Sequence, residues 1–149
     1  MDNYNYKIRN IKENDLDEVA HLYTLFWNGK MNLSKMKQKF SEISKNPNYI
    51  FLCAEESGKV IGTIQGVICE ELYGECTPFL VMENFVVAEN SRGKGVGREL
   101  LSELEKIGKE KNCSQIIFIT ETDRKETVGF YERVGFNSTS HKGFKKSLK

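Results

Sequence analysis

A glycine-rich stretch with interleaved basic residues, "RGKGVG", occupies residues 92–97 between an apolar run and an amphipathic one. The first backbone N–H groups of a helix are unpaired and lie at the positive end of the helix dipole. Glycine has no Cβ, so a ligand can approach these groups closely. The stretch therefore predicts a site for a phosphate or pyrophosphate where a strand passes into a helix.

Two well-known phosphate-binding patterns do not describe this stretch. The P-loop pattern G-x-x-x-x-G-K-[ST] is absent, and the dinucleotide pattern G-x-G-x-x-G fails because Arg98 stands at its third glycine. The sequence instead reads R-x-x-G-x-G from Arg92 to Gly97. The missing P-loop lysine and the lack of a metal-binding carboxylate cluster argue against a plain nucleotide-phosphate binder.

Glu83 is a carboxylate inside the apolar run "LVMENFVV". Strand alternation places it on one face with Val81, Phe85 and Val87. Apolar surroundings raise the pKa of a carboxylate, and this favours a role as general base, directly or through water. A strand-edge carboxylate or a structural ion pair is the alternative interpretation.

The elements that must position these residues follow from periodicity and from turn signals. Strands are expected at residues 6–11, 49–56, 59–71, 79–87 and 115–120, with one or two short strands between 136 and 148. Helices are expected at residues 14–27, 34–45, from 96 onward and 123–134. This order predicts an α/β fold with a mixed, mostly antiparallel sheet, helices on both faces, and parallel fourth and fifth strands. The 149 residues fit a single domain, 1–149.

The composition excludes several classes of partner. A net charge of +1 argues against binding to nucleic acid or to an anionic membrane. The four cysteines have no CxxC spacing and there are only two histidines, so we expect no metal site. The absence of an apolar leader and of a run of membrane-spanning length predicts a cytoplasmic protein with reduced thiols.

Two segments together resemble the GNAT N-acetyltransferase superfamily. Residues 82–105, "MENFVVAENSRGKGVGRELLSELE", resemble the fourth strand, acyl-CoA loop and third helix of that family, and residues 129–136, "GFYERVGF", resemble its penultimate helix. The resemblance implies a GNAT-like fold and direct transfer of an acetyl group from acetyl-CoA to an amine. The alternative that it leaves open is a CoA-binding sensor or regulatory module with the same fold and little turnover.

The resemblance also implies roles for individual residues. Tyr131 matches the tyrosine that acts on the CoA sulfur as general acid, although it also lies on a packing stripe. Arg124 stands where many members have an asparagine, and it would reach a phosphate instead. The implied set for acetyl-CoA binding is Phe85, Val86, Val87, Arg92, Gly93, Lys94, Gly95, Val96, Gly97, Arg98 and Arg124.

The acceptor side is less defined by sequence. The resemblance places acceptor binding in the connection between the first two helices and in the loop before the fourth strand, and Glu121 is a weaker carboxylate candidate. The implied set is Trp27, Asn28, Met31, Tyr73 and Glu121, with packing in the core as the alternative for Trp27. The acceptor would be a small-molecule or peptide amine, and a homodimer is expected because it is common in this fold.

Overall fold

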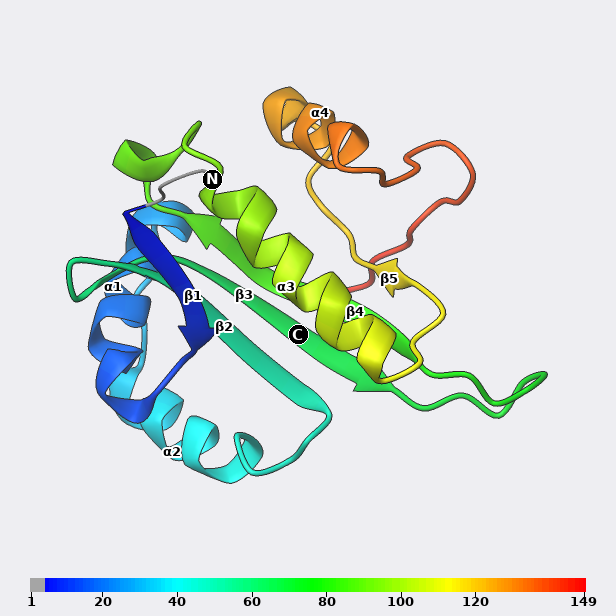
Figure 1. Cartoon of the computed structure of the whole chain (residues 1–149), viewed down its shortest axis with the longest axis horizontal. Coiled ribbons are helices and arrows are strands. Elements are labelled where there is room, and N and C mark those ends of the chain that lie inside the picture. The colour runs from blue at the N-terminus through cyan, green and yellow to red at the C-terminus, as the bar shows by residue number, and fades with distance from the viewer. Residues whose placement is uncertain (1–4) are drawn as a thin grey trace. The chain divides into compact units, whose positions relative to one another are not determined.

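The structure is a computed structural model that describes residues 5–149. The chain divides into two compact units, one that ends at Ile117 and one that comprises Phe118–Lys149 (Figure 1). Within residues 5–149, no helix is long and apolar enough to cross a bilayer. The expectation of a single domain stays a prediction.

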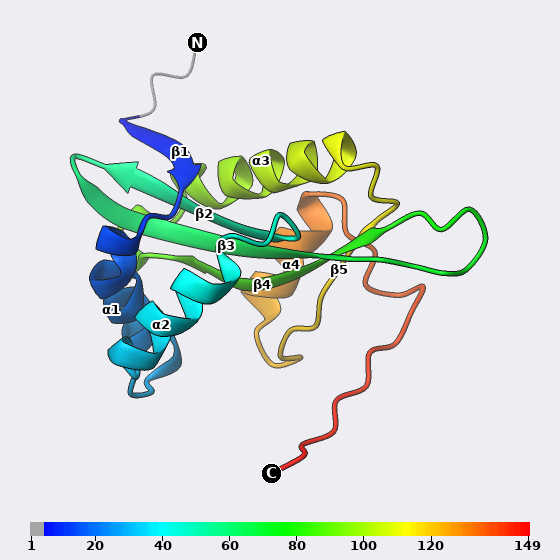
Figure 2. The same cartoon turned by 90° about the horizontal axis from the view of Figure 1, so that it is seen from below.

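The first unit is built on a five-stranded sheet in the order β1-β2-β3-β4-β5. Neighbouring strands are antiparallel except for β4 and β5, which are parallel. Helices α1 and α2 cover one face and α3 covers the other (Figure 2). The predicted α/β class, with a mixed, mostly antiparallel sheet and helices on both faces, is confirmed. The bounds are β1 Tyr6–Asn10, α1 Leu16–Trp27, α2 Leu33–Ile43, β2 Tyr49–Glu56, β3 Lys59–Cys69, β4 Phe79–Val87, α3 Val96–Glu110 and β5 Ile116–Ile117.

Helix α3 packs on the sheet through a stripe of side chains spaced three and four apart, as its sequence predicts. Val96, Leu100 and Leu104 are at most 1% exposed. Gly66 on β3 leaves room for this helix, because a Cβ there would lie 2.6 Å from the Leu104 side chain. Burial of each leucine contributes about 2 kcal/mol, so the stripe holds the start of α3 firmly against the end of β4.

Strand β4 carries a β-bulge opposite Ile64 of β3. Glu83 pairs with Gln65 and Val86 pairs with Thr63, so two residues of β4, Asn84 and Phe85, oppose one residue of β3. Asn84 has a positive φ of 48°, which asparagine tolerates better than most residues. The extra residue reverses the alternation of side chains along the strand. The alternation expected from sequence is therefore wrong past Asn84: Val86, and not Val87, shares a face with Glu83.

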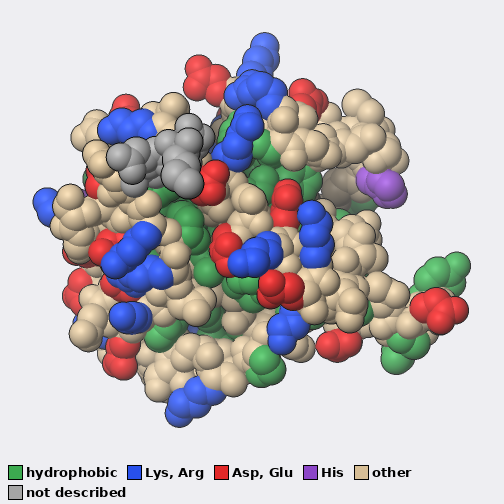
Figure 3. Space-filling view, in the orientation of Figure 1, with side chains coloured by type: hydrophobic (Ala, Val, Ile, Leu, Met, Phe, Trp, Pro, Cys, Tyr) green, Lys and Arg blue, Asp and Glu red, His purple; other side chains and the backbone are tan. Residues whose placement is uncertain are grey.

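The connection between β3 and β4 forms an arm that extends beyond the sheet (Figures 1 and 2). Leu72 and Tyr73 in this arm are 93% and 86% exposed. The space-filling view shows apolar and acidic side chains gathered on the arm, clear of the rest of the first unit (Figure 3). The arm leads into the opposite end of β4 from the glycine-rich stretch.

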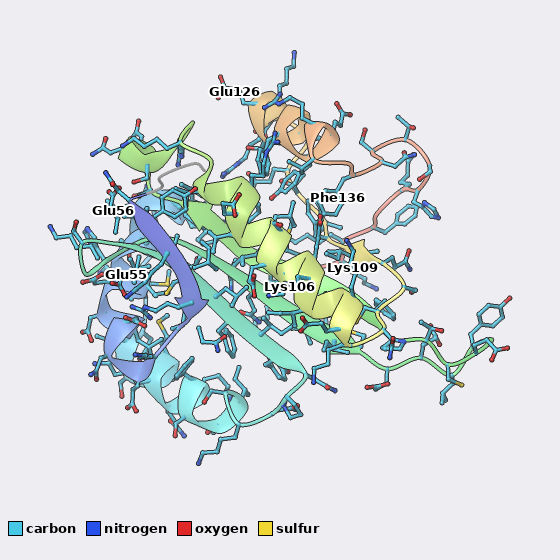
Figure 4. The ribbon with its side chains drawn as sticks, in the orientation of Figure 1. Glu55, Glu56, Lys106, Lys109, Glu126 and Phe136 are labelled. Atoms are coloured by element: carbon cyan, nitrogen blue, oxygen red, sulfur yellow. The ribbon has the colours of Figure 1, made fainter. Side chains whose placement is uncertain are left out.

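The second unit consists of helix α4, Lys125–Arg133, and an aromatic cluster beside it. The ring of Phe118 packs against those of Tyr131 and Phe136, with centroids 4.3 and 4.9 Å away. Figure 4 labels Phe136 on the segment that follows α4. This cluster supplies the unit with its apolar interior.

Two strand predictions near the C-terminal end are wrong. The strand expected at 115–120 contains only Ile116–Ile117, and Ile117 and Ile119 are 44% and 57% exposed rather than buried. No strand forms between residues 136 and 149, where the Asn137 side chain instead accepts hydrogen bonds from the N–H groups of Thr139 and Ser140. Such local side-chain bonds favour turns over strand pairing.

Candidate active site

The glycine-rich stretch forms a turn that leads into the start of α3. Gly93 and Gly95 have φ values of 73° and 85°, a conformation that favours glycine. The first helical hydrogen bond is donated by Glu99 to the Gly95 carbonyl, at 3.0 Å. Among residues 5–149, no backbone hydrogen bond of good geometry is donated by an N–H group between Gly93 and Arg98. N–H groups of this kind at the positive end of a helix are able to bind an anion.

Arg92 connects this loop to the strand before it and to α1. Its Nε donates to the Val87 carbonyl at 3.1 Å, and its guanidinium lies 6.0 Å from the centre of the Phe26 ring. The loop is also contacted from β1, where the Tyr6 hydroxyl donates to the Lys94 carbonyl at 3.4 Å. The side chains of Lys94 and Arg98 are exposed, so they add positive charge at the surface of the loop.

Strand β4 continues toward this loop beyond the residues that pair with β5. The parallel ladder joins Leu80 to Ile116 and Val81 to Ile117, whereas β4 continues to Val87. The expected binding segment, Phe85–Val87, lies in this continuation and begins at the second residue of the bulge. An extended ligand can add to such a strand edge through backbone hydrogen bonds.

Glu83 lies on β4 directly before the bulge, opposite Gln65. Its side chain is exposed, so the apolar enclosure expected from the sequence is not found. Within residues 5–149, Glu83 takes part in no salt bridge, which disfavours a structural ion pair. An exposed, uncompensated carboxylate next to a strand edge is able to accept a proton from a ligand or from water.

Tyr131 is half-buried among the aromatic side chains of the second unit. Its ring centroid is 5.5 Å from that of Phe130 and 5.7 Å from that of Phe136. Burial raises the pKa of Tyr131 to about 12, because the phenolate would be poorly solvated there. The phenol is therefore fully protonated at neutral pH and can act only as a proton donor.

Glu121 and Arg124 form a salt bridge with each other. Arg124 Nε lies 2.7 Å from Glu121 Oε2, and the two side chains are 36% and 66% exposed. Sequence reasoning assigned Glu121 to the acceptor and Arg124 to a phosphate. The salt bridge makes Glu121 a weaker base candidate than Glu83, because its carboxylate is already engaged by Arg124.

The other acceptor candidates fall in two places in the first unit. Trp27 ends α1, 43% exposed, and its ring lies 5.3 Å from that of Tyr23 and 4.8 Å from that of Phe26. Asn28 follows as the left-handed C-cap, and Met31 lies close by, 3.9 Å from where a Gly29 Cβ would stand. Because Arg92 lies over Phe26, this end of α1 adjoins the glycine-rich loop. Tyr73 lies instead in the arm, at the far end of β4.

Sequence reasoning missed the residues that hold the bulge. The Thr63 hydroxyl donates to the Asn84 carbonyl at 3.0 Å, and the Asn84 amide donates to Gln65 Oε1 at 3.0 Å. One signal was present: asparagine is depleted in strand interiors, and it stands here inside an apolar strand.

Within residues 5–149, no group of three metal-ligating side chains is close enough to hold a metal ion.

Comparisons with known proteins agree with this arrangement. The profile of the Acetyltransferase (GNAT) family matches residues 16–136. A glucosamine 6-phosphate N-acetyltransferase from Candida albicans is 27% identical over 135 residues, which cover 88% of this chain and 89% of that protein.

Two solved structures share the fold. Glucosamine-6-phosphate N-acetyltransferase from Arabidopsis thaliana is 23% identical, with 97% of this chain and 99% of that one covered at a TM-score of 0.81. AAC(6')-Iy in complex with the bisubstrate analogue CoA-S-monomethyl-acetylneamine is 20% identical, with 95% and 97% covered at a TM-score of 0.80.

Proposed function

Because this chain belongs to the GNAT acetyltransferase family, we propose that it transfers an acetyl group from acetyl-CoA directly to an amine. The observation that carries this proposal is the glycine-rich turn at the start of α3, where no N–H group between Gly93 and Arg98 donates a backbone hydrogen bond of good geometry within residues 5–149. This turn follows directly on β4, which continues beyond the residues that pair with β5. A pyrophosphate with an amide-containing arm is the ligand that matches both features.

Two parts of acetyl-CoA, the pyrophosphate and the pantetheine arm, are assigned to the first unit. The pyrophosphate is bound by the loop N–H groups, with Lys94 and Arg98 adding charge at the surface. The pantetheine arm carries two amides, and these pair with the backbone of Phe85–Val87 as an additional strand would. Arg92 donates a hydrogen bond to Val87 and contacts the Phe26 ring, so its main role is to hold the loop against β4 and α1.

The proposed reaction needs three proton transfers and no covalent enzyme intermediate. Glu83, directly or through a water, takes a proton from the substrate ammonium. The amine nitrogen then attacks the thioester carbonyl carbon. The nitrogen of the tetrahedral intermediate loses its second proton to solvent, and the carbon–sulfur bond breaks as the intermediate collapses. The electron pair of that bond goes to the CoA sulfur, which takes a proton from the Tyr131 hydroxyl. The products are an N-acetyl amide and free CoA, and the enzyme returns to its starting state by proton exchange with solvent.

We propose an amino sugar as the first acceptor class to examine. The Candida albicans relative is named for glucosamine 6-phosphate, and the bisubstrate analogue of AAC(6')-Iy contains acetylneamine. Near the loop, the exposed end of α1 offers an aromatic surface, Trp27, and a polar side chain, Asn28. Such a pair suits a sugar ring, which has an apolar face and hydroxyl groups around its edge.

Ligand binding followed by thiol release tests the proposal. Acetyl-CoA and CoA are expected to raise the melting temperature, whereas ATP is not, because the loop lacks a P-loop lysine. Free thiol is then measured over a panel of amines that begins with glucosamine 6-phosphate and includes aminoglycosides, amino acids and peptides. Amine-dependent release supports the proposal. Binding of acetyl-CoA without release by any amine would point to a sensor, and stabilisation by ATP alone to a nucleotide binder.

A further inference from the structure

The bulge in β4 is held from two sides by side chains of β3. Thr63, which is fully buried, donates its hydroxyl proton to the Asn84 carbonyl at 3.0 Å. Gln65, two residues farther along β3, accepts a hydrogen bond of 3.0 Å from the Asn84 amide. Thr63 and Gln65 are also the cross-strand partners of Val86 and Glu83, the residues that flank the bulge. Asn84 is therefore hydrogen-bonded to both Thr63 and Gln65, the two residues of β3 on either side of Ile64.

Helix α1 brings a side chain close to this arrangement. Burial raises the pKa of the Tyr23 hydroxyl on α1, and the neighbouring Thr63 side chain opposes that rise.

The bulge decides which way the next residues face. Strand side chains alternate with a period of two, so loss of the extra residue would turn Val86 and Val87 to opposite faces and shift their N–H and C=O groups by one position. Asn84 also adopts a positive φ, which unsupported strand residues rarely keep. A buried hydroxyl that bonds to the carbonyl of this residue opposes both changes.

We propose that Thr63 is a positioning residue for acyl-CoA. Its hydroxyl holds the bulge at Asn84, so that the backbone of Phe85–Val87 keeps the register in which it pairs with the pantetheine arm. This inference rests on the proposed function, and it adds residues, Thr63 with Asn84 and Gln65, that touch no substrate. The effect should fall on the pantetheine arm and leave binding at the glycine-rich loop unchanged.

The test compares two ligands by calorimetric titration: acetyl-CoA, and adenosine 3′,5′-bisphosphate, which carries phosphates but no pantetheine. Thr63→Val removes the hydroxyl and keeps the size. We expect it to weaken acetyl-CoA binding about ten-fold or more while the bisphosphate affinity stays within about two-fold. Thr63→Ser keeps the hydroxyl and should restore most of the acetyl-CoA affinity. Thr24→Val is the matched control, because the Thr24 hydroxyl donates within α1, to the Ala20 carbonyl at 2.9 Å.

Should Thr63→Val fail to fold, a pair at Asn84 takes its place. Asn84→Gly keeps access to a positive φ, whereas Asn84→Ala does not, so the alanine variant should bind acetyl-CoA more weakly than the glycine variant. Equal acetyl-CoA affinity in folded wild type and Thr63→Val, or a parallel loss for both ligands, would overturn the positioning role alone. If the wild-type protein bound the bisphosphate but not acetyl-CoA, or bound neither ligand, the proposed function would be overturned as well.

Discussion

The ring of Tyr131 packs against the ring of Phe118 with centroids 4.3 Å apart and planes inclined by 51°. The same contacts that bury Tyr131 raise the pKa of its hydroxyl to about 12. The phenol therefore keeps its proton through neutral and moderately alkaline pH. Packing and proton donation depend on different parts of this side chain, and they can be separated by removing the hydroxyl alone.

Tyr131→Phe should leave the melting temperature and the acetyl-CoA affinity nearly unchanged, because the aromatic ring remains. We expect kcat to fall about 10- to 10³-fold, the span usual for loss of a general acid. Steady-state kinetics with a rate-limiting chemical step measure it, and an acyl donor with a more acidic thiol should show a smaller loss. A wild-type rate under those conditions would make Tyr131 a packing residue. A joint loss of binding and stability would make its hydroxyl structural.

Glu83→Gln should lower kcat/KM by about 10²-fold or more and should change the acidic limb of the pH–rate profile, because it removes the proposed base. Glu121→Gln is the matched comparison, since Glu121 is already paired with Arg124 at 2.7 Å. We expect the Glu121 variant to stay close to wild type. If the two variants exchanged these outcomes, the base would be Glu121 and Glu83 would be a surface carboxylate.

Gly95→Glu should abolish acetyl-CoA binding, because it puts a negative side chain where the pyrophosphate would lie. Gly95 has a φ of 85°, so any side chain also strains the backbone there, at a cost of about 1–2 kcal/mol. Gly58, in the β2–β3 turn, has a similar φ of 81° and open space around it. Gly58→Glu therefore reproduces the strain and the charge outside the glycine-rich loop, and calorimetry should find its acetyl-CoA affinity unchanged. An unchanged acetyl-CoA affinity in a folded Gly95→Glu variant would refute the hypothesis of an anion site at this loop.

The contact between Arg9 and Asp15 should make stability fall in acid. Arg9 donates to both oxygens of Asp15, at 2.7 and 2.9 Å, and also to Glu55, labelled in Figure 4. The Arg9 hydrogen bonds hold the pKa of Asp15 and of Glu55 below their usual values. Their stabilisation is thus fully present above pH about 5 and is lost as the pH falls through the lowered pKa values of the folded state.

Asp15→Asn should reduce the free energy of unfolding at neutral pH by about 1–2 kcal/mol, between the values for exposed and buried ion pairs. Urea unfolding at a series of pH values checks it: the difference from wild type should shrink as the pH is lowered. Glu42→Gln, which removes the exposed contact with Lys39, should have almost no effect at any pH. A difference that grew in acid would contradict the pKa directions.

Features encoded within a few residues could be predicted well. The strand at 79–87 was predicted with its observed bounds, and the buried stripe of α3 matches the spacing of its apolar residues. The glycine-rich loop was predicted for the same reason, since a helix start and the φ of glycine are local properties. Predictions failed where an apolar run was taken for a buried strand at 115–120, because burial depends on what packs against the run.

Contiguous motifs were enough to predict the family, the order of the elements as far as α4 and the glycine-rich loop before α3, because each depends on residues that are close in the sequence. The bulge at Asn84 could not be predicted in this way. A bulge is a mismatch in count between two strands, so it exists only once β3 and β4 are paired, and the hydroxyl that holds it comes from Thr63, 21 positions away along the chain. Strand alternation read from β4 alone placed Val87 beside Glu83, and the pairing with β3 placed Val86 there instead.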